Sequence, residues 1–271
     1  MNYSFLNNFL LSNITKFFPK TVTRKLLRKY KVFFVPTFFK SIPKSYYPIF
    51  TNIKDQLNII NNYKIKKKLI KNNSYIKLDN LLKKLFKKSF FDFLDVGGDS
   101  IDFYLVLTNK LKINKYYIYN FKEIVNIFFI LKNKYNFQNL FPIYRIKKFN
   151  YNSFVYFGSS IQYFKNYKLL LKRIFHYKPK YIFFSGTTFF NKSKKNKDFL
   201  VVKQTNILPH TVYLYFFNLN RFVDYLNING YKVVSINNNR SANINYENFS
   251  SYLNNTRYLD ILFVRKNSNF K

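Results

Sequence analysis

The sequence predicts an α/β protein built on a mostly parallel sheet, with helices on both faces and an antiparallel strand pair at its close. Three observations support this fold class. From about residue 91 onward, short apolar runs alternate with segments of helical periodicity. Several of the five Gly residues come directly after such runs. The two final apolar runs follow one another without an evident helix, which predicts antiparallel pairing.

The elements follow in order along the chain. From Leu78 to Phe86, apolar positions at helical spacing alternate with Lys, which predicts a basic amphipathic helix. We expect it to cover a core with one solvated face, and the alternative is a helix lying on an anionic membrane. Predicted strands cover residues 91–96, 116–119, 153–157, 181–184, 231–236 and 260–265, and predicted helices cover residues 100–111, 123–133, 166–175 and 219–229. The last helix stops before Gly230, which suits a left-handed residue after a helix end.

Two parts of the chain differ in character. Residues 1–77 form a basic N-terminal extension that we expect to be helical or partly ordered, and residues 78–271 form the α/β domain. Apolar residues make up 48% of the chain, which is enough to build a sizeable core.

The net charge of +36 arises from 47 Lys and Arg against 11 Asp and Glu. It suggests an anionic partner, and we expect weak attraction to nucleic acid or to an anionic membrane surface. However, 39 of the basic residues are Lys and 8 are Arg, while Asn occurs 38 times and Ala once. An A/T-rich gene produces this usage, whereas a protein selected to bind phosphate would use more Arg. Composition therefore explains much of the charge.

Composition also excludes several classes. The chain has no Cys, which excludes disulfides, thiolate zinc sites and cysteine nucleophiles. Its two His residues, His176 and His210, lie far apart, so we expect no metal centre. His176 is expected to place a favourable charge at a helix C-terminus. No run is apolar enough to span a bilayer, and the N-terminus lacks the apolar block of an export signal, so we expect a cytoplasmic protein.

The scarce residue types converge on one short segment. Under this composition, each remaining Gly is expected to answer a steric demand. Gly97 and Gly98 follow a predicted strand, and four of the 11 acidic residues surround them. The four are Asp92, Asp95, Asp99 and Asp102. A strand that ends in an acidic residue and Gly before a helix is how Rossmann-like domains receive nucleotide cofactors, and a tight turn without chemistry is the alternative.

The stretch from about residue 91 to 235 resembles a family of S-adenosylmethionine-dependent methyltransferases commonly encoded among surface-polysaccharide genes. The resembling segments, in chain order, are residues 93–98 (FLDVGG), 158–164 (GSSIQYF), 181–189 (YIFFSGTTF), Asp198 with residues 202–204 (VKQ), and 213–217 (YLYFF). The resemblance implies a Rossmann-like class I methyltransferase fold, S-adenosylmethionine as cofactor, and methyl transfer to a sugar or surface-glycan precursor.

The resemblance also implies which residues form the site. Those expected at the cofactor are Asp95, Gly97, Gly98, Asn120, Ser159, Ser160, Gln162 and Tyr163, and those expected at the substrate are Thr187, Gln204 and Tyr213. A general base assists when the acceptor is a hydroxyl. His210 is the candidate base because it is the one His in the substrate segment, and an ordinary loop His is the alternative.

Five residues depart from the family pattern. Ile101 stands where the family has Gly, and Asn120 stands where such enzymes place a carboxylate for the ribose. Ser185-Gly186 replaces an Asp-Arg pair, and Thr188 replaces Pro. These departures support a second interpretation, a catalytically inactive methyltransferase-like binding or assembly subunit. The charge supports a third, an RNA-binding or ribosome-associated protein whose affinity would fall steeply with salt.

Overall fold

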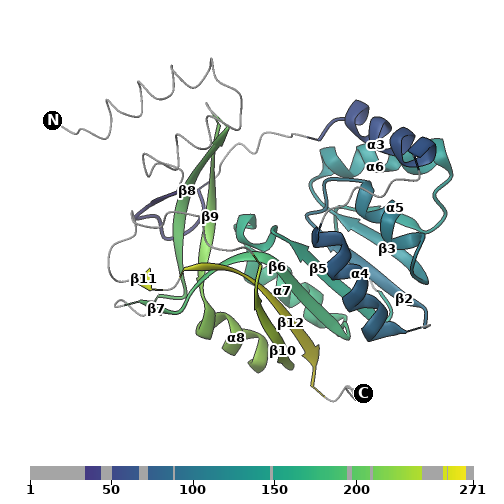
Figure 1. Ribbon diagram of the computed structural model, residues 1–271. Helices are drawn as coiled ribbons and strands as arrows, with labels where there is room; N and C mark the ends of the chain where they lie inside the picture. The colour runs from purple at the N-terminus through teal and green to yellow at the C-terminus, as the bar shows by residue number, and fades with distance from the viewer. Residues whose placement is uncertain are drawn as a thin grey trace.

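The computed structural model describes residues 34–43, 51–66, 73–87, 89–146, 149–193, 197–207, 210–239, 253–254 and 256–266. These residues form one large sheet with helices on both faces, and a long hairpin extends from one side of it (Figure 1).

The parallel part of the sheet is centred on β2 (Phe91–Val96), whose residues are all buried. On one side lie β3 (Ile113–Tyr119) and then β4 (Leu140–Ile143), and on the other lie β5 (Ser153–Gly158) and then β6 (Tyr181–Phe190). All four neighbouring pairs are parallel. The chain therefore moves outward from β2 in one direction, returns, and continues in the other direction, which creates a switch point beside β2.

The sheet closes with two antiparallel strands. β12 (Arg257–Arg265) pairs antiparallel with β6 and with β10 (Tyr231–Asn238), so it lies between them. The order along the sheet is thus β4-β3-β2-β5-β6-β12-β10. This confirms the predicted antiparallel closing pair and gives the Rossmann-like class I methyltransferase fold, with an N-terminal segment added to it.

Helices form one layer on each face of the sheet. On one face, the helices contribute to a core cluster that includes Phe93, Tyr116 and Phe154, and on the other face they contribute to a cluster that includes Leu94, Val155 and Ile182. The first layer consists of α3 (Ile53–Lys66), α4 (Asn73–Phe86), α5 (Asp102–Thr108) and α6 (Lys122–Tyr135), and the second of α7 (Tyr167–His176) and α8 (Leu219–Ile228). None of the helices in the described ranges is long and apolar enough to cross a membrane.

Several predicted element ends are confirmed. Helix α7 ends at His176, in the C-terminal position expected for that side chain. Gly230 follows α8 with a φ of +89°, as the left-handed position requires. Helix α5 is shorter than predicted because the N–H groups of Lys110 and Leu111 both bond to the carbonyl of Leu107 and close the helix in a turn.

A hairpin that the sequence reasoning missed follows β6. It consists of β8 (Phe199–Ile207) and β9 (His210–Asn218), and β1 (Phe34–Pro36) from the N-terminal segment pairs with β8. Short strands β7 (Lys192–Ser193) and β11 (Leu253–Asn254) form a separate pair. The segment 213–217 is continuously aromatic and apolar, so it lacks the period-two pattern that marks a strand.

Candidate functional site

The carboxyl ends of β2, β3 and β5 meet at one edge of the sheet, beside the switch point. Hydrogen bonds tie the three loops together. The Gly97 N–H donates to the Tyr119 carbonyl at 2.7 Å, and Asn120 Nδ2 donates to the Gly98 carbonyl at 2.8 Å. The hydroxyl of Ser160 donates to the last carbonyl of β2. Predicted site residues from three separate segments therefore lie together at this edge.

The two glycines of the first loop are required by their surroundings. Gly97 has a φ of +82°, and a Cβ there would lie 2.6 Å from the Cβ of Ser160. A Cβ on Gly98 would lie 2.4 Å from Oδ2 of Asp95. Side chains of the protein itself thus occupy the space beside both glycines. As expected from the sequence, neither position has room for a Cβ. The atoms that exclude it belong to the neighbouring side chains of Ser160 and Asp95.

Asp95 is the central carboxylate of the loop. It is 5% exposed and accepts a hydrogen bond from the Tyr116 hydroxyl at 3.1 Å. Burial raises the pKa of Asp95 from 3.8 to about 7, the Tyr116 hydrogen bond opposes that rise, and the charges of Asp99 and Asp102 add to it. Asp95 therefore lies close to half-ionised near neutral pH.

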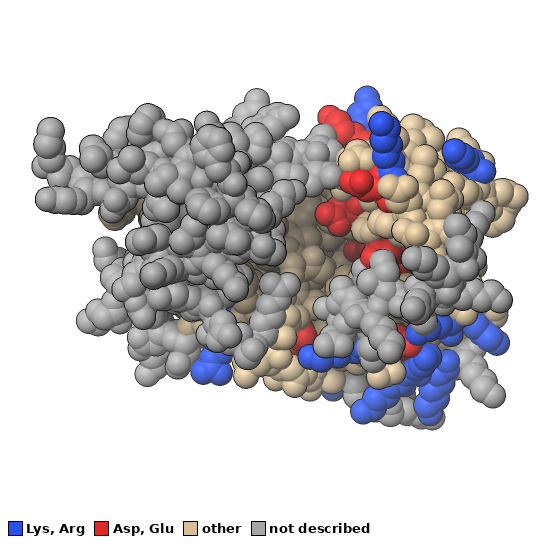
Figure 2. All heavy atoms as spheres, turned by 45° about the horizontal axis from the view of Figure 1, so that its top comes forward, with Lys and Arg blue, Asp and Glu red and all other residues tan. Residues whose placement is uncertain are grey.

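Acidic side chains gather at this edge although the chain as a whole is strongly basic. Asp99 and Asp102 lie close enough to Asp95 to affect its ionisation. No ion pair of Asp95 or Asp99 occurs within the described residues. Figure 2 shows a hollow on this side of the molecule with a run of acidic side chains along one wall, while the visible Lys and Arg lie mainly on the outer flanks. The described carboxylates therefore contribute a negative potential at the hollow.

The loop also offers backbone donors. Within the described part of the chain, the N–H groups of Gly98 and Ser100 make no hydrogen bond with the protein. Both residues are half-buried and precede α5. Unpaired N–H groups at this position are available to an oxygen of a ligand or to water.

Helix α3 covers the next amide of the loop. The Ile101 N–H donates to Oε1 of Gln56 at 2.8 Å, and the Thr51 hydroxyl donates to the Asp99 carbonyl at 3.0 Å. The Ile101 side chain is fully buried in the same core cluster as Ile60 of α3. Ile is therefore accommodated at this departure from the family pattern because its amide and its side chain both face α3.

Asn120, which stands where the family has a carboxylate for the ribose, already makes hydrogen bonds within the protein. It is 9% exposed, and besides its bond to Gly98 its Oδ1 accepts the N–H of Phe121 at 2.8 Å. It lies directly after β3, where the ribose carboxylate was expected. Its side chain joins the second loop to the first.

The segment after β5 forms the predicted floor and contacts the predicted substrate segment. Ser159 has a φ of 55°, and its N–H donates to the Ser185 carbonyl at 2.7 Å. A short 3₁₀ helix, η2 (Ile161–Tyr163), follows, and its Tyr163 hydroxyl donates to Oε1 of Gln204 at 3.0 Å. Gln162 is buried, and its Oε1 has no partner among the described residues. Tyr163 and Gln204 are thus brought together as one contact.

The other predicted substrate residues are placed differently. Thr187 lies within β6 with its side chain fully buried, and its hydroxyl has no partner in the described part of the structure. Tyr213 is half-buried in β9 and packs edge-on against Phe39 at 5.5 Å between ring centroids. His210 begins β9 opposite Ile207, at the tip of the hairpin, and its side chain lies outside what is described.

Two contacts of the site were not predicted. Tyr116 reaches Asp95 because Asp95 pairs with Ile118 and residues two apart on a strand share a face, so the register of β2 and β3 would have revealed it. Phe164 stacks on Tyr119 at 6.1 Å and lies 3.7 Å from the Cβ position of Gly97. Its place directly after η2 was the available signal.

Asp260 of β12 organises the edge beyond β6. Its Oδ1 accepts from the Ser185 hydroxyl at 2.9 Å, from the Gly186 N–H at 2.9 Å and from Nδ2 of Asn239. A carboxylate with three donors is well satisfied, so Ser185 and Gly186, where the family has Asp-Arg, belong to a structural network here. The described residues contain no cluster of three His, Asp or Glu able to hold a metal ion.

No family model and no curated protein matches the chain. Similar solved structures include the N-terminal domain of EvdMO1 with SAH bound (14% identity, 73% of this chain and 82% of that chain, TM-score 0.48). Others are an S-adenosylmethionine-dependent methyltransferase from Clostridium acetobutylicum (12%, 79% and 100%, 0.45) and SAM-bound CalS10, an amino pentose methyltransferase from Micromonospora echinaspora (5%, 72% and 91%, 0.46). These similarities concern the fold and assign no role to any residue of this chain.

Proposed function

We propose that the edge formed by the carboxyl ends of β2, β3 and β5 binds S-adenosylmethionine, and that the protein transfers its methyl group to a sugar or surface-glycan precursor. The observation that carries this proposal is the acidic loop in a chain of net charge +36. S-adenosylmethionine carries a sulfonium and an ammonium charge against one carboxylate, so it is a net cation and negative potential favours its binding. The carboxylates of Asp95, Asp99 and Asp102 supply that potential at the switch point of the sheet.

Each residue of the site has an expected task. Asp95 is buried, so it acts on the ligand through its field, whereas exposed Asp99 is free to contact a cationic group. The Gly98 and Ser100 amides would hold a ligand oxygen, and Asn120 would face the ribose. Phe164 and Tyr163 would border the nucleoside. The glycan acceptor follows from the family resemblance of residues 91–235.

When bound, S-adenosylmethionine supplies a sulfonium methyl that passes to an acceptor oxygen or nitrogen, leaving S-adenosylhomocysteine while the acceptor loses a proton. The chain contributes mainly by positioning. His210 is the proposed base for a hydroxyl acceptor. Gln204, Tyr213 and Thr187 lie on the elements proposed to shape the acceptor side, and Gln204 is linked to the cofactor side by Tyr163.

Calorimetric titration with S-adenosylmethionine and S-adenosylhomocysteine tests the proposal. The two ligands differ by the methyl group and the sulfonium charge, so Asp99→Asn should weaken S-adenosylmethionine binding about threefold to tenfold and S-adenosylhomocysteine binding less. Asp198→Asn is the matched control, because Asp198 is an exposed carboxylate paired with Lys168 at 3.0 Å. Equal losses for both ligands, or no binding at millimolar concentration, would contradict the proposal.

The pH dependence supplies a second test of the same site. A cation favours the ionised form of Asp95, whose pKa burial raises to about 7. Affinity for S-adenosylmethionine should therefore increase as the pH rises from about 6 to about 8, and Asp95→Asn should flatten the profile. An unchanged profile in the variant would remove Asp95 from the site.

Cofactor binding without turnover is a second candidate function. It is favoured by the engagement of the Ile101 amide with Gln56 and of Asn120 with Gly98, which leaves fewer groups for the ligand. Incubation with labelled S-adenosylmethionine and a panel of sugars, with His210→Asn alongside, separates the two. Label transferred by the wild type and lost in the variant supports the enzyme, whereas binding without transfer supports the inactive module.

A further inference from the structure

A groove lies on the α7 face of the sheet, away from the acidic loop. The connection from β4 to β5 contains no helix in residues 144–146 and 149–152, although α5, α6 and α7 fill the corresponding connections elsewhere. Ile146 and Phe149 of this connection pack into the core cluster that contains α7. Phe149 also packs against Tyr177 at 5.5 Å between ring centroids. Between the thin connection and α7, a cavity of about 670 Å³ remains open.

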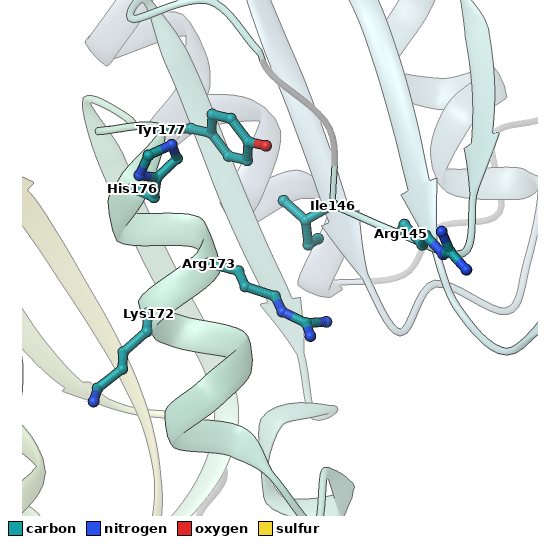
Figure 3. A pocket seen from close by; sticks show the side chains of 6 residues that line it. All are labelled: Arg145, Ile146, Lys172, Arg173, His176 and Tyr177. Carbon is teal, nitrogen blue, oxygen red and sulfur yellow. The ribbon is translucent and has the colours of Figure 1, made fainter.

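Three of the six residues that line the groove are Lys or Arg, and an aliphatic and an aromatic side chain add an apolar component. Its lining residues are Arg145, Ile146, Lys172, Arg173, His176 and Tyr177. Figure 3 shows the Arg173 guanidinium and the Tyr177 ring extending from α7 toward the segment that carries Arg145 and Ile146, while Lys172 and the Arg145 guanidinium point away from the space between. The Arg145 guanidinium lies 5.8 Å from the centroid of the Tyr144 ring. Arg173 and Tyr177 share a helix face because they are four residues apart.

The charge of the groove is uncompensated within the described residues. The ion pairs there join Lys83 and Lys110 to Asp79 and Lys168 to Asp198, and none involves the groove. Two of the eight Arg residues of the chain line this cavity, although Lys is about five times more frequent. Lys is abundant throughout this chain because of its composition, so a Lys at the cavity says little about function. The presence of two of the scarce Arg residues is stronger evidence for an anion-binding site. Guanidinium groups bind phosphate oxygens through two parallel hydrogen bonds.

We propose that this groove binds a nucleoside diphosphate, with Arg173 holding the diphosphate, the exposed Arg145 side chain turning in to join it, and Tyr177 and Ile146 contacting the base. The volume lies within the range of small-ligand sites. The aromatic ring and the aliphatic side chain provide the apolar surface that a base needs, and the two Arg residues provide the cationic wall. The proposal is independent of methyl transfer, because the groove shares no residue with the acidic loop.

One lining residue of the groove, Arg173, lies near the end of β3. Burial raises the pKa of Tyr119, and the nearby charge of Arg173 opposes that rise, which places the guanidinium within electrostatic range of the tyrosine hydroxyl. Tyr119 directly precedes Asn120. Arg173 is therefore the groove residue nearest in charge effect to the strand end that borders the acidic loop.

Titration of the full chain with uridine diphosphate tests the proposal, since uracil does not mimic the adenine of the other site. The wild type should bind uridine diphosphate more tightly than inorganic diphosphate, and excess S-adenosylhomocysteine should not compete. The double variant Arg145→Gln/Arg173→Gln should bind at least about tenfold more weakly, because two charge-assisted contacts are lost. Arg257→Gln is the matched control, an exposed Arg on β12 that should change affinity less than about twofold.

Tyr177→Leu separates the base contact from the phosphate contact. It should reduce affinity for uridine diphosphate and leave that for inorganic diphosphate unchanged, with thermal melting used to show that packing on Phe149 survives. A photoreactive uridine diphosphate should crosslink to residues 144–146 or 172–177. The proposal is overturned if uridine diphosphate does not bind at millimolar concentration, if it binds no tighter than diphosphate, or if Arg257→Gln weakens binding equally. Binding of single-stranded RNA but not of uridine diphosphate would also overturn it.

Discussion

The acidic loop after β2 lies at the carboxyl edge of the sheet, the cationic groove lies beside α7 on one of its faces, and the two are built in opposite ways. In the loop, Asp95 is buried, hydrogen-bonded and packed against Gly98. In the groove, Arg145 and Arg173 are exposed and have no ion-pair partner in the described part of the chain. The loop carboxylate therefore contributes to folding and to any ligand, whereas the two groove guanidinium groups make no ion pair within the described residues and remain available to a ligand.

This difference determines what substitutions can show. A change in the loop alters stability and binding together, so the two effects must be measured separately. A change in the groove should leave stability nearly untouched, so a loss of binding there can be attributed to the contact itself. Substitutions that change the free energy of unfolding when made in the loop, but not when made in the groove, would establish this difference between the two sites.

The largest expected effect is on the pH dependence of stability, through Asp95→Asn. Asp95 has a pKa of about 7 in the folded protein against 3.8 as its ordinary value, so between these values the folded chain binds more protons than the unfolded chain. The free energy of unfolding therefore falls as the pH rises from about 4 to about 7, by about 4 kcal/mol at 1.36 kcal/mol per pKa unit. The neutral Asn variant should lose that slope and be more stable than wild type at pH 8, as urea unfolding across pH would measure.

Asp92→Asn provides the contrasting control on the same strand. Asp92 is buried, but its carboxylate accepts the Asn150 N–H at 3.0 Å and Nδ2 of Asn114 at 3.1 Å. Removing its charge weakens two hydrogen bonds, so this variant should be less stable than wild type at pH 8. Destabilisation by both variants at that pH would show that Asp95 is satisfied as an anion.

The second effect concerns Gly97, which should tolerate Ala far less well than Gly230 does. Both have positive φ, +82° and +89°, but a Cβ on Gly97 meets Ser160 at 2.6 Å while one on Gly230 has nothing within 4 Å. Left-handed strain costs about 1 kcal/mol at either position, and overpacking adds about 2 kcal/mol at Gly97. Chemical denaturation should give losses of about 3 and about 1 kcal/mol. Equal losses would mean that Ser160 moves aside freely.

Much of the fold could be predicted because short apolar runs alternate with segments of helical periodicity, and because the few Gly residues mark the ends of elements. Strand β2 was predicted at its observed bounds, and Gly230 was assigned its conformation correctly. The hairpin β8–β9 could not be predicted in this way. Its residues 213–217 are apolar on both faces, because the strand is buried in the sheet, and the period-two signal is then lost.

The sequence predicted which residues gather at the candidate site better than it predicted the contacts they make there. The order of segments placed Gly97, Asn120 and Ser160 at one edge, since carboxyl ends of parallel strands meet there. That Gln56 covers the Ile101 amide depends on how a helix from the N-terminal segment packs. Local sequence does not encode such a long-range contact. The sequence therefore shows that Ile101 replaces the family's Gly, but not that Gln56 accepts its N–H.

The third effect is the loss of the hydrogen bond between the Ile101 N–H and Gln56, which Gln56→Ala removes. Gln56 is 4% exposed, and its removal leaves the buried Ile101 N–H without an acceptor. An unsatisfied buried donor costs about 2 kcal/mol. Thermal unfolding should show that loss, whereas Lys54→Ala on the exposed side of α3 should change stability by less than about 0.5 kcal/mol. A neutral Gln56→Ala would mean that water replaces the side chain and that the loop is open to solvent.

The smallest effect belongs to the groove. Arg145→Gln/Arg173→Gln removes two exposed cations that line one cavity and have no carboxylate partner in the described structure. Like charges repel, so the variant should be as stable as wild type at high salt and more stable by a few tenths of a kcal/mol at low salt. Urea unfolding at low and at high ionic strength measures the difference. A clear loss of stability at either ionic strength would show that these guanidinium groups make structural contacts, and the distinction between loop and groove would then fail.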